Sequence, residues 1–213
     1  VMDSDWDCTI QDEDGAFEVR LGLRLVSHLA KATGLRIVEA RQQAPFDSAD
    51  DLARRAGVSD SEMKVLAGAD ALMSLSGHRR QQVWDAAALK AAPALLTEAP
   101  IDEDYLELRA APEGEEVVWD YASTGLTLRS HPLALLRPRL ARRGLLSAAQ
   151  LDKVRDGQVV RACGIVTLRQ QPETAKGTVF VSLEDETGTV QVICWKSIRE
   201  TQREALLKAR LMA

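Results

Sequence analysis

The chain has 213 residues, of which 46% are hydrophobic and 4% aromatic, and its formal net charge at pH 7 is −5. This length and composition can support one large core or two small ones. No apolar run is long enough to cross a bilayer, which excludes membrane-spanning classes, and we expect no membrane partner. Three scattered cysteines form neither a disulfide framework nor a CxxC metal pair, which favours a reducing, cytoplasmic location.

The acidic residues are concentrated in two short segments. Residues 1–20 contain seven acids and one base, and residues 93–120 contain nine acids and one base. Residues 121–158 have the opposite balance, with seven bases and two acids. The segments expected to fold are therefore mildly basic, which permits a nucleic-acid partner although the whole chain is negative.

The first part of the chain predicts a β-hairpin followed by helices. Residues 5–21 look extended, with apolar and polar side chains alternating around an Asp-Gly turn. In residues 21–92 the apolar side chains recur at helical spacing instead. Capping-box patterns at Ser48 and Ser59 mark two helix starts, and a further helix is expected from about residue 78.

The stretch LRLVSHLAKATGLRIVEARQQAPF, residues 23–46, predicts two short helices joined by a tight corner. Its spacing is that of a helix-hairpin-helix. That module binds phosphates through backbone N–H groups at its corner and at the start of the following helix. The corner consists of Ser27, His28, Leu29 and Ala30.

The corner has no glycine, although the module usually has glycines there. His28 and Ala30 stand at those positions. Glycine would permit positive φ and a close approach to a phosphate. Two interpretations stay open. The corner is either packed scaffold with little grip on DNA, or a duplex-binding corner assisted by the charges of Lys31 and Arg36.

The middle of the chain is expected to connect two folded regions. Residues 93–120 combine three prolines with acidic side chains and predict a connecting segment. A helix-turn pattern follows at residues 124–144, and Pro132 and Pro138 are expected to break it. The pattern SAAQLDKV, residues 147–154, predicts a short capped helix.

From residue 159 the hydrophobic period changes to two. Three strands are predicted, VVRACGIVTL (159–168), TVFVSLED (178–185) and TVQVICW (189–195), and a tight turn joins the last two. A helix from residue 197 to about 208 and the start of a fourth strand follow. This is the order of an oligonucleotide-binding (OB) barrel. The predicted fold class is α+β: a helix-hairpin-helix domain followed by a truncated all-β OB-fold barrel.

These segments, in this order, resemble the C-terminal third of bacterial C-family DNA polymerases, the family of the replicative DNA polymerase III alpha subunit. EARQQAPFDSADDLARRAGV and LAGADALMSLSGHRR resemble that family's hairpin elements. YASTGLTLRSHPLALLRPRL resembles the segment before its barrel, and GTVFVSLEDETGTVQVICW resembles two barrel strands. SDWDCTIQ and LGLRLVSHL are most similar to the error-prone branch. The resemblance covers nearly the whole chain.

The resemblance implies a parent DNA polymerase that uses Mg²⁺ held by palm aspartates. The acid clusters here lie in a terminal hairpin and a proline-rich segment, so we expect no catalytic residue, metal site or cofactor in this chain. The implied function is holding duplex and single-stranded template DNA during damage-induced mutagenesis and translesion synthesis. The implied partners are DNA, the sliding clamp and accessory proteins of the mutagenesis cassette.

The expected domain boundaries follow from these segments. Residues 1–20 form a hairpin that joins the upstream polymerase core, and residues 21–92 form the helix-hairpin-helix domain. Residues 93–158 are the acidic, proline-rich linker with a basic helical segment, and residues 159–213 are the partial OB fold.

Basic side chains near the hairpins and in the linker are the first candidate DNA contacts. Arg79 and Arg80 follow the second hairpin element, and the run RPRLARRG is the densest positive patch. A solvated surface is the plainer interpretation of each, and the run could instead pair with residues 93–120. The candidates are Lys31, Arg36, Arg79, Arg80, Arg137, Arg139, Arg142 and Arg143.

The barrel supplies the second group of candidates. Alternation places Val179, Val181 and Leu183 inside the barrel, and Phe180 and Trp195 on outer faces where bases could stack. Packing of both aromatic rings against a helix or another domain is the alternative. The basic side chains that could follow a nucleic-acid backbone here are Arg161, Arg169 and Lys176.

A protein-interaction platform is the competing functional interpretation. The glycine-free corner, the negative net charge and the incomplete barrel favour it. If the basic residues at 137–143 and the trio at 161, 169 and 176 form one stripe, nucleic acid is favoured. If acidic segments cover them, a protein partner is favoured. The three histidines and three cysteines are too far apart in the sequence to predict a metal site.

Overall fold

The computed structural model describes residues 1–13, 15–88 and 106–213, which form two units, Val1–Leu128 and Arg129–Ala213. The division differs from the predicted one. The described part of the expected linker, residues 106–158, is shared between the two units and contains three helices. Within the described residues, no helix combines the length and the apolar character needed to span a membrane.

Unit 1 begins with the predicted β-hairpin. Strand β1 (Thr9–Glu13) pairs antiparallel with β2 (Ala16–Arg20), so that Thr9 lies opposite Arg20. Gly15 in the turn has a φ of +83°, a left-handed conformation that glycine adopts without steric cost. The hairpin is a separate two-stranded sheet.

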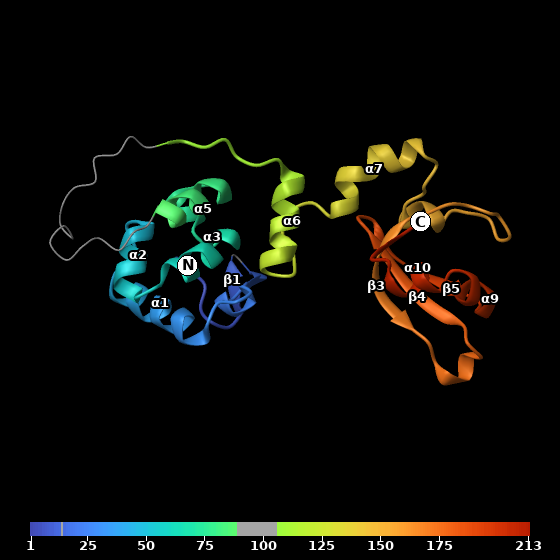
Figure 1. Ribbon diagram of the computed structural model, residues 1–213, viewed down its shortest axis with the longest axis horizontal. Coiled ribbons are helices and arrows are strands. Elements are labelled where there is room, and N and C mark those ends of the chain that lie inside the picture. Colours follow the sequence, from blue (N-terminus) through green and yellow to red (C-terminus); the bar gives the residue numbers. More distant parts are fainter. Residues whose placement is uncertain (14, 89–105) are drawn as a thin grey trace. The chain divides into compact units, whose positions relative to one another are not determined.

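A cluster of short helices follows the hairpin and forms the body of unit 1 (Figure 1). The first helical segment of the predicted hairpin module is only a single 3₁₀ turn, η1 (Leu23–Leu25). The helices after it are α1 (Lys31–Gln43), α2 (Ala49–Ala56), α3 (Asp60–Gly68), α4 (Met73–Ser76) and α5 (Arg79–Ala88). Their apolar faces enclose the completely buried side chains of Ile37, Leu52, Met63, Leu66 and Leu72.

The predicted helix starts are confirmed. The Ser48 side chain accepts a hydrogen bond from the Asp51 N–H at the start of α2, and Gly57 ends that helix with a φ of +59°. Ser59 and Glu62 form a reciprocal capping box at the start of α3. These local hydrogen bonds use groups close in sequence, which is why the pattern is readable without the fold.

One helix of unit 1 was not predicted. Residues 113–120 were expected to connect domains, yet α6 (Glu113–Ser123) forms there with Pro112 as its N-cap. The sequence holds a start signal, since Glu113, Glu115 and Glu116 fill the first turn, where negative charge is favourable. The acidic composition of the segment concealed this signal.

In unit 2, the proline prediction was wrong. Helix α7 (Pro132–Arg142) starts at Pro132, whose missing N–H is harmless at the first helical position, and continues through Pro138. His131 caps the helix by accepting a hydrogen bond from the Leu133 N–H. The predicted short helix is present as α8 (Ala148–Leu151), with a capping box formed by Ser147 and Gln150.

The sheet of unit 2 is antiparallel with the strand order β5-β4-β3-β6 and forms a half-barrel of the OB type. Its strands are β3 (Gly164–Gln170), β4 (Val179–Asp185), β5 (Gly188–Cys194) and β6 (Leu211–Met212). The first strand begins five residues later than predicted. The expected single helix is two, α9 (Lys196–Thr201) and α10 (Arg203–Lys208). Figure 1 shows these elements in orange and red. The predicted α+β fold class is confirmed.

The core of unit 2 lies on one face of this sheet. Val179, Val181 and Leu206 of α10 are buried together, and Val166 and Leu183 pack against them. The predicted inward direction of Val179 and Val181 is therefore confirmed. The other face of β4 and β5 remains open, and it carries the candidate stacking residues.

Candidate nucleic-acid interface

The corner of the first hairpin is built as a glycine corner would be, although it has no glycine. His28 has a φ of +67°, in the left-handed region, and its side chain is exposed. Leu29 points into the core and is 7% exposed. The conformation costs a residue with a side chain about 1–2 kcal/mol, so the surrounding fold imposes it. The backbone thus keeps the shape that a glycine corner has, but the His28 side chain restricts how closely a phosphate can approach it.

Helix α1 starts directly after this corner and has an open, positive end. Its N-cap, Ala30, has no side chain that can accept a hydrogen bond from the first turn. The first turn contains the exposed Lys31 and no acid. The first N–H groups of a helix lack partners within it and carry the positive end of the helix dipole. The Glu62 carboxylate of α3 already accepts a hydrogen bond from Thr33 Oγ1 in this turn, so a bound anion would lie at the N–H groups beside Lys31.

Helix α6 contacts the same corner from the other side. The Ser27 N–H donates a 2.7 Å hydrogen bond to the Ser123 carbonyl in the last turn of α6. Trp119 and Ser123 of α6, together with His28, Lys64 and Gly68, line a shallow hollow. Two N–H groups of the corner, those of Ser27 and Leu29, are therefore used within the protein, which directs attention to the start of α1 as a donor group.

The second hairpin element does not present its glycine to solvent. A Cβ built on Gly68 would lie 3.6 Å from the ring of Trp119, so Gly68 is packed against α6. The turn after α3 is made instead by Asp70, whose φ is +58°. A Cβ at this distance would make an ordinary van der Waals contact, so packing against α6 buries Gly68 but does not by itself require glycine.

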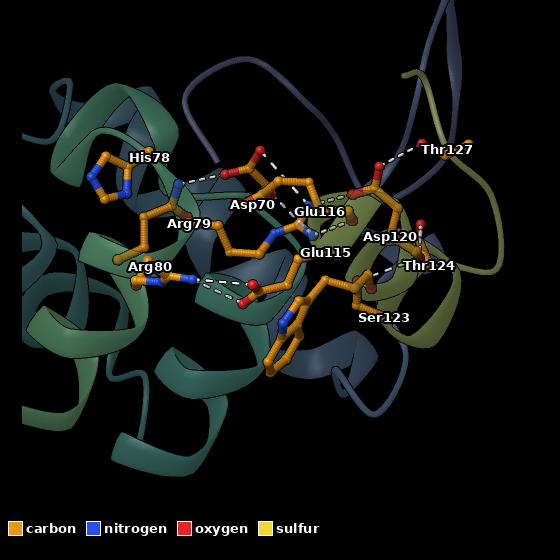
Figure 2. A network of polar contacts seen from close by, with 12 residues as sticks. Asp70, His78, Arg79, Arg80, Glu115, Glu116, Asp120, Ser123, Thr124 and Thr127 are labelled. Atoms are coloured by element: carbon orange, nitrogen blue, oxygen red, sulfur yellow. Dashed lines mark hydrogen bonds and ion pairs between the residues drawn. The ribbon is translucent and has the colours of Figure 1, made fainter. Parts of the chain in front are cut away.

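Arg79, a predicted phosphate contact, is buried, and the structure contradicts that prediction. It is 3% exposed and lies among the carboxylates of Asp70, Glu116 and Asp120, as Figure 2 shows. Its Nη1 is 3.3 Å from Glu116 Oε2 and donates a 2.9 Å hydrogen bond to the Glu116 carbonyl. Asp120 also accepts a hydrogen bond from Thr127. The Arg79 guanidinium holds α6 to α5 and is not available to a phosphate.

Its neighbour Arg80 lies at the surface. Arg80 Nη2 is 3.1 Å from both carboxylate oxygens of Glu115, and Nη1 donates to the Arg109 carbonyl. Its side chain is 40% exposed. A phosphate could compete for Arg80 Nη2 only by displacing the Glu115 carboxylate, and this contact is also drawn in Figure 2.

Arg36 is engaged in a similar way. Its guanidinium donates hydrogen bonds to the carbonyls of Ala56 (2.9 Å) and Gly57 (3.0 Å), and to Thr33 Oγ1 (3.2 Å). It therefore neutralises the last carbonyls of α2. Arg36 and Lys31 were the two charges predicted to assist the first corner. Arg36 is bound to the end of α2, and Lys31 has no such contact with another described element.

Two arginines of unit 2 also have structural partners. Arg137 of α7 is 2.9 Å from Asp185 and from Glu186 in the β4–β5 turn, and the hydrogen bond to Glu186 raises the Arg137 pKa. Arg169 donates to the carbonyls of Leu206 and Ala209 at the end of α10. Both guanidinium groups tie elements of unit 2 together, which weakens the prediction that they follow a nucleic-acid backbone.

The other predicted arginines of unit 2 are exposed and lie near one another in the fold. The Leu146 N–H donates a 2.8 Å hydrogen bond to the Arg161 carbonyl, which brings Arg161 close to the end of α7. In the described part of the chain these side chains form no ion pair. They are Arg139, Arg142, Arg143 and Arg161. Position at the carboxyl end of a helix also favours arginine through the helix dipole, so structure alone can account for two of them.

Lys176 is separated from Arg161 along the chain by the whole of strand β3. It lies in the β3–β4 loop, with a left-handed φ of +48°. A Cβ built on the next residue, Gly177, would lie 3.4 Å from Arg199 Nη1 and from Lys196 Cγ. Lys196 and Arg199 were not among the candidate nucleic-acid contacts predicted from the sequence. Their signal is the sequence WKSIR, which places two bases one helical turn apart directly after Trp195.

The open face of the sheet carries the predicted aromatic residues. Trp195 is 64% exposed, and Phe180 is half-buried and pairs with Ile193, which is 49% exposed. Leu168 of β3 lies on the same side, opposite Ser182. The basic residues around Lys176 therefore border an apolar, aromatic surface, a combination that suits single-stranded nucleic acid.

No group of three or more histidine, cysteine or acidic side chains is placed to hold a metal ion in the residues that the structure describes. Burial raises the thiol pKa of Cys163 and of Cys194, so both are poor metal ligands and nucleophiles at neutral pH.

Comparison with known proteins first shows what unit 1 is similar to. Residues 1–82 match the family described as helix-hairpin-helix motif. This match covers the hairpin, the corner and the helices up to the buried Arg79, so unit 1 contains a helix-hairpin-helix region as predicted.

The whole chain is also similar to larger proteins. It is 52% identical to the error-prone DNA polymerase of Ralstonia nicotianae, 47% to that of Azoarcus sp. and 43% to that of Methylococcus capsulatus. All of this chain is covered in each comparison, but only 20%, 20% and 22% of these relatives. This similarity over the whole chain confirms the resemblance to the C-terminal part of error-prone DNA polymerases.

Proposed function

We propose that this chain holds DNA within an error-prone DNA polymerase that acts in damage-induced mutagenesis and translesion synthesis. Nucleotide addition, with Mg²⁺, takes place in another part of that polymerase. The observation that carries the proposal is the start of α1. An uncapped helix end with Lys31 and no acid in its first turn follows a left-handed corner inside the matched helix-hairpin-helix region.

The two units take different forms of DNA in this proposal. The α1 end in unit 1 binds a phosphate of the primer–template duplex. In unit 2, Trp195 stacks a base of the single-stranded template while Lys176 and Arg199 attract its backbone. The exposed arginines at the end of α7 add electrostatic attraction without sequence preference.

A second candidate is a docking platform for the sliding clamp or for accessory mutagenesis proteins. It is favoured by the contact between α6 and the corner, since the Ser27 N–H already donates to Ser123. It is also favoured by the number of arginines whose guanidinium groups bind other elements of the chain, among them Arg36, Arg79, Arg137 and Arg169.

The test is fluorescence anisotropy of the chain with single-stranded and primer–template DNA across a salt series. We expect Lys31→Ala to weaken duplex binding and to reduce the slope of log affinity against log salt by about 0.9, the value for one phosphate contact. Arg54→Ala is the matched control, because Arg54 is an exposed base of the same unit, 66% exposed and distant in sequence from the corner.

The two candidates give different results. If Lys31→Ala and Arg54→Ala bind duplex equally well, the corner does not hold DNA. If the unaltered chain binds neither form of DNA even at low salt, the docking platform is the better account of both units.

A further inference from the structure

The β1–β2 hairpin exposes an apolar face that none of the described residues of unit 1 covers. Ile10, Phe17 and Val19 are 74%, 79% and 64% exposed. Ile10 lies directly opposite Val19, and Phe17 lies opposite Asp12. Since side chains two residues apart share a face of a strand, these four emerge on the same side of the hairpin.

The hairpin is attached to unit 1 through its base. The Gly22 N–H donates to Cys8 Sγ at 3.3 Å, and Arg24 forms a 2.9 Å ion pair with Asp7. None of the three apolar residues on the exposed face belongs to the core of unit 1. A two-stranded hairpin is marginally stable unless one of its faces is packed. We therefore expect another protein surface to bind this apolar face.

We propose that this face docks onto the polymerase part of the same chain that precedes this region. The inference rests on the proposed function, since it takes the chain to be part of an error-prone polymerase. Relatives that match the whole chain have about four fifths of their length outside the match. A surface on the same polypeptide is present at high effective concentration, which favours it over a separate partner.

The side chains of the hairpin face indicate what kind of surface on the polymerase could bind it. Its centre is apolar and aromatic, and Asp12 adds an exposed carboxylate beside Phe17. The receiving surface is therefore an apolar depression for the Phe17 ring, bordered by a lysine or arginine that pairs with Asp12. This docking fixes the helix-hairpin-helix region relative to the polymerase, so it positions the DNA that the region holds.

The test is hydroxyl-radical footprinting of the Phe17 side chain. Its oxidation is compared between the full-length polymerase and the 213-residue chain. We expect several-fold slower oxidation of Phe17 in the full-length protein. Equal oxidation in both would overturn the proposal. Protection of Phe17 in the 213-residue chain that grows with protein concentration would also overturn it, because the occupant would then be a second copy.

A pair of variants of the full-length polymerase separates docking from general misfolding. Phe17→Asp places a charge in the docking face and is expected to expose the hairpin to protease cleavage within residues 9–20. Glu18→Gln alters the opposite face of the same strand and is expected to leave cleavage unchanged. Equal cleavage of both variants and the unaltered protein contradicts docking.

Failure of this inference is distinguishable from failure of the proposed function. DNA anisotropy of the 213-residue chain does not depend on the docking face. If that chain binds DNA but Phe17 is unprotected in the polymerase, docking alone is wrong. If Phe17 is protected but the chain binds no DNA, the DNA-holding function alone is wrong.

Discussion

At the scale of single residues, position in the fold decides what a charged or polar side chain does. Arg79 and Arg80 are adjacent in sequence, yet Arg79 is buried among three carboxylates and Arg80 pairs with Glu115 at the surface. His28 occupies a left-handed corner position that the fold requires of whatever residue stands there. Each of these differences has a measurable consequence.

Replacing His28 by glycine is expected to stabilise unit 1. Relief of a left-handed conformation gains about 1–2 kcal/mol, and the greater backbone freedom of glycine in the unfolded chain costs about 0.5–1 kcal/mol. The net increase in the free energy of unfolding is therefore between about 0 and about 1.5 kcal/mol, measurable by urea denaturation. Gly57→Ala, at a φ of +59°, is the control and should lower stability.

Replacing Arg79 by alanine is expected to destabilise unit 1 by about 3–5 kcal/mol, because buried carboxylates then lose their cation. Arg80→Ala removes an exposed pair and should cost less than about 1 kcal/mol. Urea denaturation of the two variants measures the difference. Similar losses of stability from both would mean that the buried cluster does not hold α6 in place.

At the scale of elements, a few ion pairs decide how helices attach to their neighbours. The β4–β5 turn holds α7 through Arg137 and holds the start of α8 through the Ala148 N–H, which donates to Asp185. Burial raises the pKa of Asp185, but hydrogen bonds from Thr187 and Ala148 outweigh it and leave the pKa lowered. The hydrogen bond from Arg137 lowers the pKa of Glu186.

This turn makes the stability of unit 2 depend on pH. The ordinary pKa values are 3.8 for Asp185 and 4.5 for Glu186, and both are lower in the folded protein. As the pH falls, the unfolded chain binds protons first, so the contribution to stability is complete above about 4.5 and is lost below it. Urea denaturation between pH 7 and pH 3 measures this loss.

Asp185→Asn provides the comparison for the pH measurement. Since this variant removes one of the two titrating groups, its free energy of unfolding should change less between pH 7 and pH 3. An unchanged pH profile would show that other carboxyl groups control acid unfolding of unit 2.

At the scale of the whole molecule, each unit has a core of its own. Leu66 is completely buried in unit 1, and Val181 is completely buried in unit 2. Leu66→Ala is expected to destabilise unit 1 by about 2–5 kcal/mol through lost burial and a residual cavity. Amide hydrogen exchange should accelerate at Ile37 and stay unchanged at Val181. Equal acceleration at both would show that the units unfold together.

Local signals were the part of the fold most readable from sequence. The Ser59–Glu62 capping box, the strand alternation around Val181 and the Asp185–Gly188 turn were all predicted, because their partners are near in sequence. Helix α6 was missed because its acids suggested a connecting segment. Pro132 was misread because the same residue that interrupts a helix interior also suits the first helical position.

The candidate site was only partly predictable for a different reason. The basic residues were located correctly as charges, but sequence does not show which carboxylate or carbonyl lies beside a guanidinium. Arg36, Arg137 and Arg169 all proved to bind carbonyls or carboxylates of other elements. Lys31 and Trp195 kept the exposure that a DNA contact requires.

The sequence by itself determined the order of elements, the α+β class and the relation to error-prone polymerases, since these depend on periodicity, caps and motifs along the chain. Only the tertiary structure decided which cations are available to a ligand, that α6 contacts the hairpin corner and that no described residue of unit 1 covers the hairpin face. Those properties depend on contacts between residues far apart in the sequence, such as Arg79 with Asp120 and Ser27 with Ser123. Burial and ion pairing arise from such contacts, and no local pattern encodes them.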